Sequence, residues 1–267
     1  KQLRAIGLDA EKYRPVLKNV GEKFESQFEF SPLPLQKILD ELDPHALNTR
    51  LLIAESETGS GKTEAALNWF CKLFIAGKVD SLYFALPTRV AARELYNRIN
   101  DYVCSWFPDL DCRPVTLLAV PGYAQVDGYS IKELIPDSKK ANLWQEDLKT
   151  AGLERYWAGA RPKRFLAATI AVGTIDQALL SIVQTAHAHL RSICLDRSLL
   201  VVDEVHASDL YMSRLLRSLL THHLGIGGRA MLLSATLGSR ALNEYIQITK
   251  PGDELPKLST AKIGRAH

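Results

Sequence analysis

The chain has 267 residues, 46% of them hydrophobic and 24% charged, with a formal net charge of +3. This is ordinary globular composition, and the length suits one large α/β domain or a domain with part of a neighbour. The charge is too small to identify a nucleic-acid-binding protein, and the longest apolar run, 165–172, is too short to cross a bilayer. The four cysteines lack CxxC spacing and no signal peptide opens the chain, which predicts a cytoplasmic protein with free core thiols and no membrane contact.

The first 30 residues carry mixed charge and spaced apolar side chains but no recognisable site. We expect an approach segment or linker there. Pro32 and Pro34 then precede a short predicted helix, 35–39, because proline is well tolerated at a helix start. The apolar run 51–54 follows and predicts a short buried strand.

The segment 56–63, Ser-Glu-Thr-Gly-Ser-Gly-Lys-Thr, lies between this strand and a predicted helix from 64. A glycine-rich turn that opens a helix can hold phosphates on backbone N–H groups, so the segment is a P-loop candidate. Glycines allow close backbone approach, Lys62 would contact the β- and γ-phosphates of ATP, and the Thr63 hydroxyl would ligate Mg²⁺. The strict pattern has glycine where this chain has Ser56. The predicted nucleotide-binding residues here are Thr58, Gly59, Ser60, Gly61, Lys62 and Thr63.

A second buried strand, 81–86, is predicted to end in Pro87-Thr88-Arg89, followed by a helix through about 103. Ligand-contacting groups of an open α/β sheet gather at the carboxyl ends of its strands. A hydroxyl and a guanidinium there suit a phosphodiester backbone. The tripeptide alone equally fits a plain helix cap.

The middle of the chain contains an irregular stretch. A third strand is predicted at 115–120, and glycines and prolines interrupt the pattern from 121 to 164, as expected of an insertion. Trp144 and Trp157 could stack on a base there. Tryptophans in such a stretch more often anchor a loop or insertion against the core, and we favour that interpretation. The run 165–172 predicts a fourth strand, ending in Gly173-Thr174 before a helix, a second candidate contact for a phosphate backbone.

The clearest buried strand, 198–202, delivers Asp203 and Glu204 at its carboxyl end. Paired acids after such a strand are typical of a Walker B element. Asp203 would hold Mg²⁺, and Glu204 would position and deprotonate the water that attacks the γ-phosphate. A helix over about 208–224 and a strand over 230–233 follow, and the strand ends in Ser234-Ala235-Thr236.

The ordered motifs resemble those of superfamily 2 helicases. The matching residues are Gln36, the P-loop, Pro87-Thr88-Arg89, Gly173-Thr174, Asp203-Glu204-Val205-His206 and Ser234-Ala235-Thr236. In that superfamily the glutamine contacts the adenine ring, and the last tripeptide links the nucleotide and nucleic-acid sites through its hydroxyls. The resemblance gives His206, Ser234 and Thr236 coupling roles. Segments 58–67, 171–177 and 203–207 further resemble the CRISPR-associated helicase-nucleases of type I systems, and the Val-Gly-Thr-Ile-Asp-Gln string is the most discriminating.

This resemblance implies a RecA-like P-loop domain over 31–247, with a mostly parallel sheet covered by helices on both faces. It also implies an ATP-dependent DNA translocase that is recruited by an RNA-guided surveillance complex, loads on single-stranded DNA, and unwinds and degrades the target. A nuclease domain upstream and a second RecA-like domain, which supplies an arginine finger, are expected outside this sequence. The fragment alone should therefore bind ATP weakly and hydrolyse it poorly.

Residues 248–267 are expected to begin the next region. The last five, 263–267, match a translated sequencing adapter, and a genuine polar tail is the alternative. Two other functions remain open: a general DEAD/H-type helicase acting on RNA or DNA, and a nucleotide-regulated binding module. Glu204 argues against the module, since a switch without hydrolysis does not need that carboxylate.

Overall fold

The computed structural model describes residues 10–130, 159, 161–183, 185–205 and 210–248. Within them, strands form one sheet in the order β1-β8-β7-β2-β6-β3-β4-β5. The strands from β1 to β3 in this order are parallel, and β4 and β5 add an antiparallel hairpin at one edge. The strands are β1 Leu51–Glu55, β2 Ser81–Leu86, β3 Thr116–Ala119, β4 Gln125–Val126, β5 Tyr129–Ser130, β6 Ile170–Thr174, β7 Ser198–Val202 and β8 Arg229–Ser234.

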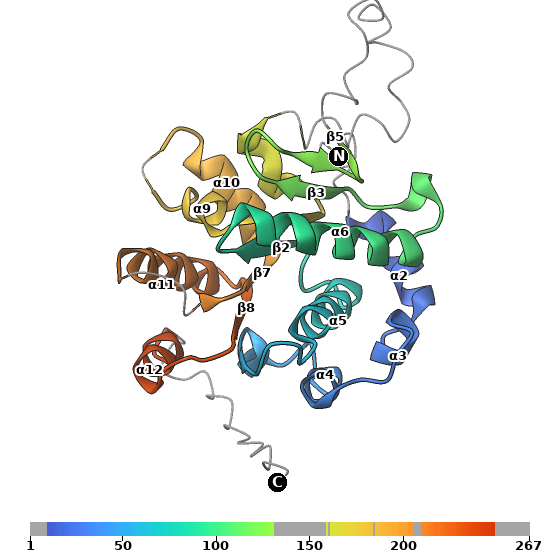
Figure 1. Cartoon of the computed structure of the whole chain (residues 1–267), viewed down its shortest axis with the longest axis horizontal. Coiled ribbons are helices and arrows are strands. Elements are labelled where there is room, and N and C mark those ends of the chain that lie inside the picture. The colour runs from blue at the N-terminus through green and yellow to red at the C-terminus, as the bar shows by residue number, and fades with distance from the viewer. Residues whose placement is uncertain (1–9, 131–158, 160, 184, 206–209, 249–267) are drawn as a thin grey trace, which may run out of the picture.

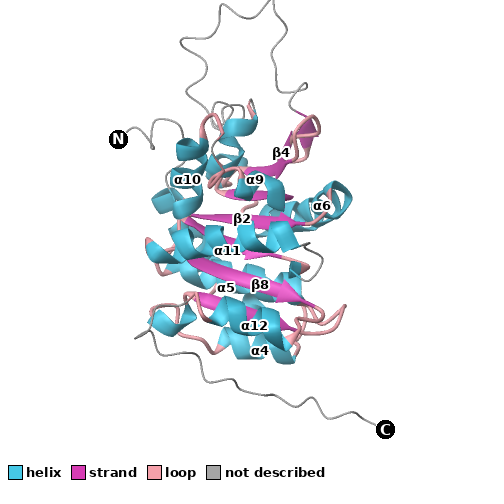
Figure 2. Ribbon diagram, turned by 90° about the vertical axis from the view of Figure 1, so that its left-hand side faces the viewer, coloured by secondary structure: helices cyan, strands magenta, loops and turns pink. Residues whose placement is uncertain are grey.

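Helices cover both faces of this sheet, as Figures 1 and 2 show. One face packs against α2 to α6, and the other against α9 to α12. The α-helices are α2 Arg14–Val20, α3 Phe24–Gln27, α4 Pro34–Asp40, α5 Lys62–Ile75, α6 Arg89–Trp106, α9 Ile175–Leu179, α10 Ala188–Asp196, α11 Leu210–Gly225 and α12 Ser239–Ile246. The 3-10 helices are η1 Ala10–Lys12, η2 Leu47–Thr49, η3 Leu110–Cys112 and η6 Pro162–Ala167. The predicted fold class is confirmed.

The side chains of each central strand alternate between two hydrophobic cores. In β7, Leu199 and Val201 lie in the core shared with α5 and α6, whereas Leu200 and Val202 lie in the core shared with α11. A parallel strand buried on both faces carries an uninterrupted apolar run. This is why β7 and β2 are found in the structure with the bounds that the sequence predicts.

Residues 10–30 are part of this domain. Tyr13, Leu17, Phe24 and Phe28 are at most 2% exposed and share a core with α5 and α6. The Phe24 and Phe28 rings stack with centroids 4.6 Å apart. The described part of the predicted approach segment is therefore built into the core rather than left as a linker.

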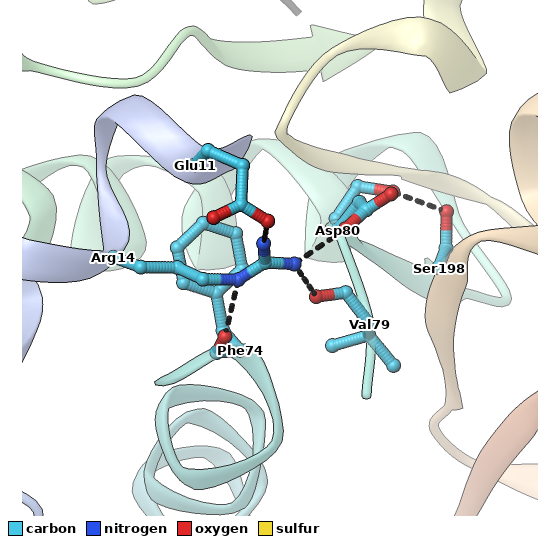
Figure 3. A network of polar contacts seen from close by, with 7 residues as sticks. Glu11, Arg14, Phe74, Val79, Asp80 and Ser198 are labelled. Atoms are coloured by element: carbon cyan, nitrogen blue, oxygen red, sulfur yellow. Dashed lines mark hydrogen bonds and ion pairs between the residues drawn. The ribbon is translucent and has the colours of Figure 1, made fainter. Parts of the chain in front are cut away.

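Arg14 ties this segment to the sheet (Figure 3). Its Nε donates to the Phe74 carbonyl oxygen at 2.8 Å, at the end of α5, and its guanidinium forms ion pairs with Glu11 and with Asp80. Asp80 directly precedes β2, and its backbone N–H donates to the Arg197 carbonyl oxygen at 2.9 Å. Arg14 thus joins α2 to the amino end of β2, and the Asp80 backbone joins that end to the residue before β7.

The apolar run 165–172 is divided between two elements. Its first residues belong to the 3-10 helix η6, and β6 begins only at Ile170. The predicted strand is therefore wrong for 165–169. A short apolar run fits a helical turn as well as a strand, and Pro162 at the start of η6 favours the helical turn because its φ is already helical.

The irregular region 121–164 begins with the β4–β5 hairpin. Residues 131–158 and 160, which include Trp144 and Trp157, lie outside the described residues. So do 249–267, where the next region and the adapter-like end are predicted.

All four cysteines are free. Cys71 and Cys194 are buried, whereas Cys104 and Cys112 are half-buried, so the prediction of core thiols holds for two of them. Burial raises the pKa of the Cys71 thiol, which makes it a poor nucleophile. Among the described helices, none combines the length and apolar character needed to span a membrane.

Candidate nucleotide site

The loop between β1 and α5, residues 56–61, has the backbone that a P-loop requires. Gly59 and Gly61 have φ angles of +84° and +75°, in the left-handed region that favours glycine. Gly61 is the N-cap of α5, so unpaired N–H groups of the first helical turn point toward the loop. A Cβ atom on Gly61 would collide with the Gln36 side-chain amide. The positive φ therefore favours glycine at position 61, and a larger residue would also have to displace the Gln36 amide.

Lys62 folds back over this loop. Its Nζ donates to the carbonyl oxygens of Ser56 at 2.6 Å and Glu57 at 3.1 Å. The Ser56 and Ser60 hydroxyls lie 2.7 Å apart and brace the loop. Ser56 does not have a positive φ, so its backbone has no need of the glycine found in the strict pattern. The departure at Ser56 is thus compatible with the P-loop geometry.

Gln36 lies against the P-loop rather than in solvent. Its side chain is fully buried, its Nε2 donates to the Gly61 carbonyl oxygen at 3.0 Å, and its Oε1 accepts from the Leu33 N–H at 2.7 Å. Gln36 is therefore held inside the domain and is not a solvated helix residue. The adenine contact stays a prediction, and the position of Gln36 beside Gly61 is compatible with it.

The acidic pair lies two strands away from the P-loop. Strand β8 separates β7 from β1, so the P-loop and the acids stand about 10 Å apart at the usual strand spacing. The Asp203 N–H donates to the Ala85 carbonyl oxygen at 2.9 Å, and the Asp203 Oδ1 accepts from the Glu204 N–H at 2.9 Å. Glu204 has a φ of +55°, a strained value for a residue with a side chain. Such strain is concentrated at functional sites, which supports the predicted role.

The Ser234-Ala235-Thr236 segment connects these two parts. It follows β8, the strand between the P-loop and the acids. The Ser56 N–H donates to the Ser234 carbonyl oxygen at 3.1 Å, and the Leu237 N–H donates to Glu55 Oε1 at 3.0 Å. Ser234 is 2% exposed, whereas Thr236 is exposed. The start and the end of this segment are thus both attached to the base of the P-loop, as a coupling role would require.

Thr63 and Asp203 carry the types of oxygen donor that Mg²⁺ takes, and their role as its ligands stays a prediction. Hydroxyl and carboxylate oxygens are hard ligands, and Mg²⁺ usually takes only one or two side chains together with phosphate oxygens and waters. The described residues contain no group of three His, Cys, Asp or Glu side chains suited to a metal ion. The donor set described here therefore fits a phosphate-bound Mg²⁺ better than an all-protein metal site.

The predicted nucleic-acid contacts lie at the carboxyl ends of neighbouring strands. Pro87, Thr88 and Arg89 are exposed after β2, and Thr88 caps α6 by accepting from the Ala91 N–H at 3.2 Å. The helix-cap interpretation is thus confirmed, without excluding a second role. Leu86 of β2 is opposite Thr174 of β6 in the sheet.

Gly173 and Thr174 are both buried. The Thr174 carbonyl oxygen accepts from the Tyr83 hydroxyl at 2.8 Å, and Thr174 is the N-cap of α9 without a side-chain capping bond. Their contact with nucleic acid stays a prediction. His206, the remaining predicted coupling residue, lies outside the described residues.

Glu64 is a polar residue next to the P-loop to which the motif analysis gives no role. It follows Thr63 in α5, is 5% exposed, and forms an ion pair with Arg98 of α6. The Tyr102 hydroxyl donates to the same carboxylate at 3.2 Å, and burial followed by the Glu64 charge raises the pKa of Tyr102. Arg98 and Tyr102 follow Glu64 by 34 and 38 positions in the chain, so no local sequence spacing could have revealed these contacts.

A parallel sheet that presents a P-loop, an acidic pair and a connecting hydroxyl segment at one edge defines a RecA-like nucleotide-binding domain. No protein-family model matches the chain. The CRISPR-associated endonuclease/helicase Cas3 of Escherichia coli is 33% identical over 210 residues, which are 78% of this chain and 22% of that protein. The resemblance to the CRISPR-associated helicase-nucleases is therefore confirmed, and the chain spans about a fifth of the length of this relative.

Solved structures agree with this relationship. T. fusca Cas3 with AMPPNP aligns with a TM-score of 0.64 and 31% identity, covering 85% of this chain and 24% of that one. A chain of a CRISPR RNA-guided surveillance complex, in the pre-nicking state, aligns with a TM-score of 0.54 and 28% identity, covering 81% of this chain and 20% of that one.

Proposed function

We propose that this chain is the ATP-binding half of a DNA helicase motor in a CRISPR-associated helicase-nuclease. The observation that carries the proposal is that three motifs meet at the carboxyl ends of neighbouring strands and that two of them are hydrogen-bonded to one another. The P-loop follows β1, the acids follow β7, and the Ser234 segment between them is bonded to the base of the P-loop. The similarity to Cas3 solved with AMPPNP supports ATP as the nucleotide.

In this proposal different residues at and near the P-loop bind different parts of ATP. The N–H groups at the start of α5 hold phosphate oxygens, and Lys62 exchanges its bonds to loop carbonyls for bonds to the β- and γ-phosphates. Thr63 and Asp203 would hold Mg²⁺, which when bound neutralises charge on the phosphates. We assign Gln36 to the adenine ring, and its hydrogen bond to the Gly61 carbonyl oxygen, which keeps it beside the P-loop, supports this role.

Glu204 is the proposed general base. Its carboxylate accepts a proton from the water that attacks the γ-phosphate, and the fixed backbone at Asp203 and Glu204 orients the carboxylate. The Ser234 segment, with Thr236 and His206, passes the state of the nucleotide to the nucleic-acid contacts. In the complete protein a second RecA-like domain contributes an arginine finger, so this half alone turns over ATP poorly.

The proposed partners are single-stranded DNA and an RNA-guided surveillance complex. The first rests on the exposed Pro87-Thr88-Arg89 tripeptide, and the second on similarity to a chain of a solved surveillance complex. A nuclease domain elsewhere in the protein would degrade the unwound strand. These roles place the protein in the cytoplasm, where its DNA target is found.

The direct test is Glu204→Gln in the complete helicase-nuclease. ATP binding should persist, because the side chain keeps its size, whereas hydrolysis should fall by about 100-fold or more because the proton acceptor is lost. Binding is measured with a fluorescent ATP analogue and hydrolysis by phosphate release with DNA present. Full turnover by the variant would refute the assignment of Glu204.

A further inference from the structure

A cavity of about 990 Å³ opens between α6 and the hairpin edge of the sheet. Its walls come from α6, from the segment after β3 and from β4, with η6 beneath. Strand β3 stands five positions from β1 in the sheet, about 24 Å away at the usual strand spacing. Figures 1 and 2 place this edge at the end of the molecule opposite α4 and α12. The cavity is thus separate from the nucleotide site.

One wall is a stripe of α6. Arg89, Arg93 and Asn97 recur every four residues, so they share one helix face with a rise of about 6 Å between neighbours. All three are exposed, and within the described part of the chain neither arginine forms an ion pair. The stripe begins directly after Pro87 and Thr88. Two guanidinium groups are therefore available to an anionic chain entering at Arg89.

The opposite wall and the floor suit a planar heterocycle. Tyr123 is 69% exposed at the cavity, and Gln125 offers an amide. Leu118, Val120 and Phe165 are buried and contribute apolar surface. An aromatic ring beside a basic groove is the usual means of binding single-stranded nucleic acid, because every base has a face on which it can stack.

A further lining residue argues against a simple phosphate site. Glu94 carries a carboxylate into the same cavity, which repels an anion there but can accept a hydrogen bond from a base amino group. Asn97 and Gln125 each offer both a donor and an acceptor to a base edge. The lining thus combines cations for the backbone of a strand with neutral and acceptor groups for a base.

We propose that this cavity holds a nucleotide of single-stranded DNA, with its base stacked on Tyr123 and its phosphates against Arg89 and Arg93. The proposal rests on the DNA-motor function and extends the DNA contact from the exposed tripeptide along α6 to the hairpin. It assigns Arg93, Asn97 and Tyr123 to DNA binding, none of which belongs to a recognised motif.

The experiment measures binding of the complete helicase-nuclease to a fluorescent single-stranded oligonucleotide by anisotropy, at several salt concentrations. Tyr123→Ala should weaken binding about 10-fold and Tyr123→Phe should retain it, because stacking needs the ring and not the hydroxyl. Arg93→Ala should weaken binding and lower the salt slope by about 0.7. Lys78→Ala, which removes an exposed charge just before the amino end of β2, is the matched control and should change neither.

An abasic oligonucleotide separates base capture from phosphate contact. Wild type should bind it about as weakly as Tyr123→Ala binds the normal strand, and Tyr123→Ala should lose nothing further on it. A free mononucleotide added in excess should fail to displace the strand if the site reads a base within a chain. Displacement by the mononucleotide would overturn the strand assignment in favour of a small-molecule site.

Two other outcomes are distinguishable. If wild type binds DNA but the Tyr123 and Arg93 variants bind equally well, the cavity proposal fails while the motor function stands. If the complete helicase-nuclease does not bind single-stranded DNA at all, both fail. Binding of the fluorescent ATP analogue, unchanged in every variant, shows that the variants are folded.

Discussion

Gly173 shows how a residue can be singled out by sequence for one reason and required by the structure for another. The sequence places it in a motif that predicts contact with a phosphate backbone. In the sheet, a Cβ atom on Gly173 would lie 2.7 Å from both the Ala119 carbonyl oxygen and the Tyr83 hydroxyl. The glycine therefore allows β6 to pack closely against its neighbours, and its predicted DNA contact stays a prediction.

Gly173→Ala should destabilise the chain by about 1–3 kcal/mol, because the added methyl group overpacks a buried site whose neighbours include backbone. Urea unfolding followed by circular dichroism measures the change. Gly238→Ala is the control, since no atom beyond its two chain neighbours lies within 4 Å of the position that its added methyl group would take, and it should change stability by less than about 0.5 kcal/mol. Equal stability of the two variants would contradict the packing role.

The Lys62 ammonium donates hydrogen bonds to the loop carbonyl oxygens of Ser56 and Glu57. Lys62→Ala should therefore weaken binding of a fluorescent ATP analogue by at least about 10-fold, because a charged donor to the phosphates is lost. Lys78→Ala removes an exposed ammonium far from the P-loop and should leave affinity unchanged. Unaltered ATP binding by Lys62→Ala would remove the basis of the P-loop assignment.

Two helices, α5 and α6, begin at the candidate nucleotide-binding and DNA-binding segments. The first begins at Lys62 and the second begins after the exposed Pro87-Thr88 pair. The Glu64 carboxylate bridges them through Arg98 and Tyr102. The helix that begins at the P-loop is therefore attached to the helix that lines the proposed DNA cavity.

Arg98→Ala should lower the free energy of unfolding by about 1–2 kcal/mol, because a buried carboxylate loses its cation while the half-exposed arginine limits the effect. Adding Glu64→Gln should recover part of the loss, since a neutral amide needs no counter-charge. Denaturant unfolding of both single variants and the double variant gives the coupling energy. Strictly additive losses would show that the two side chains do not interact.

At the scale of the whole molecule, residues 10–30 pack into the same core as the sheet and its helices. Phe24 is fully buried, stacks on Phe28, and shares its core with α5 and α6. Arg14 fixes the preceding helix to the amino edge of the sheet (Figure 3). The domain therefore includes residues that carry no helicase motif.

Phe24→Ala should cost about 3–5 kcal/mol of stability, and the remaining transition should stay single and cooperative because the segment unfolds with the sheet. Phe24→Leu keeps most of the volume and should cost less than about 1.5 kcal/mol. Both are measured by urea unfolding with fluorescence and circular dichroism in parallel. A Phe24→Ala variant as stable as wild type would restore the linker interpretation of residues 10–30.

The sequence by itself determined the parallel α/β class, the strands β2 and β7, the P-loop and the acidic pair. It could do so because a strand buried on both faces is a continuous apolar run, and phosphate-binding turns use glycine and lysine at fixed local spacing. Only the tertiary structure decided what Gln36, Gly173 and Glu64 contact, and that the N-terminal segment belongs to the core. Those facts depend on contacts between residues distant in the chain, which local spacing does not encode. The split of 165–172 into η6 and β6 was ambiguous for a related reason, since a short apolar run packs equally well as either.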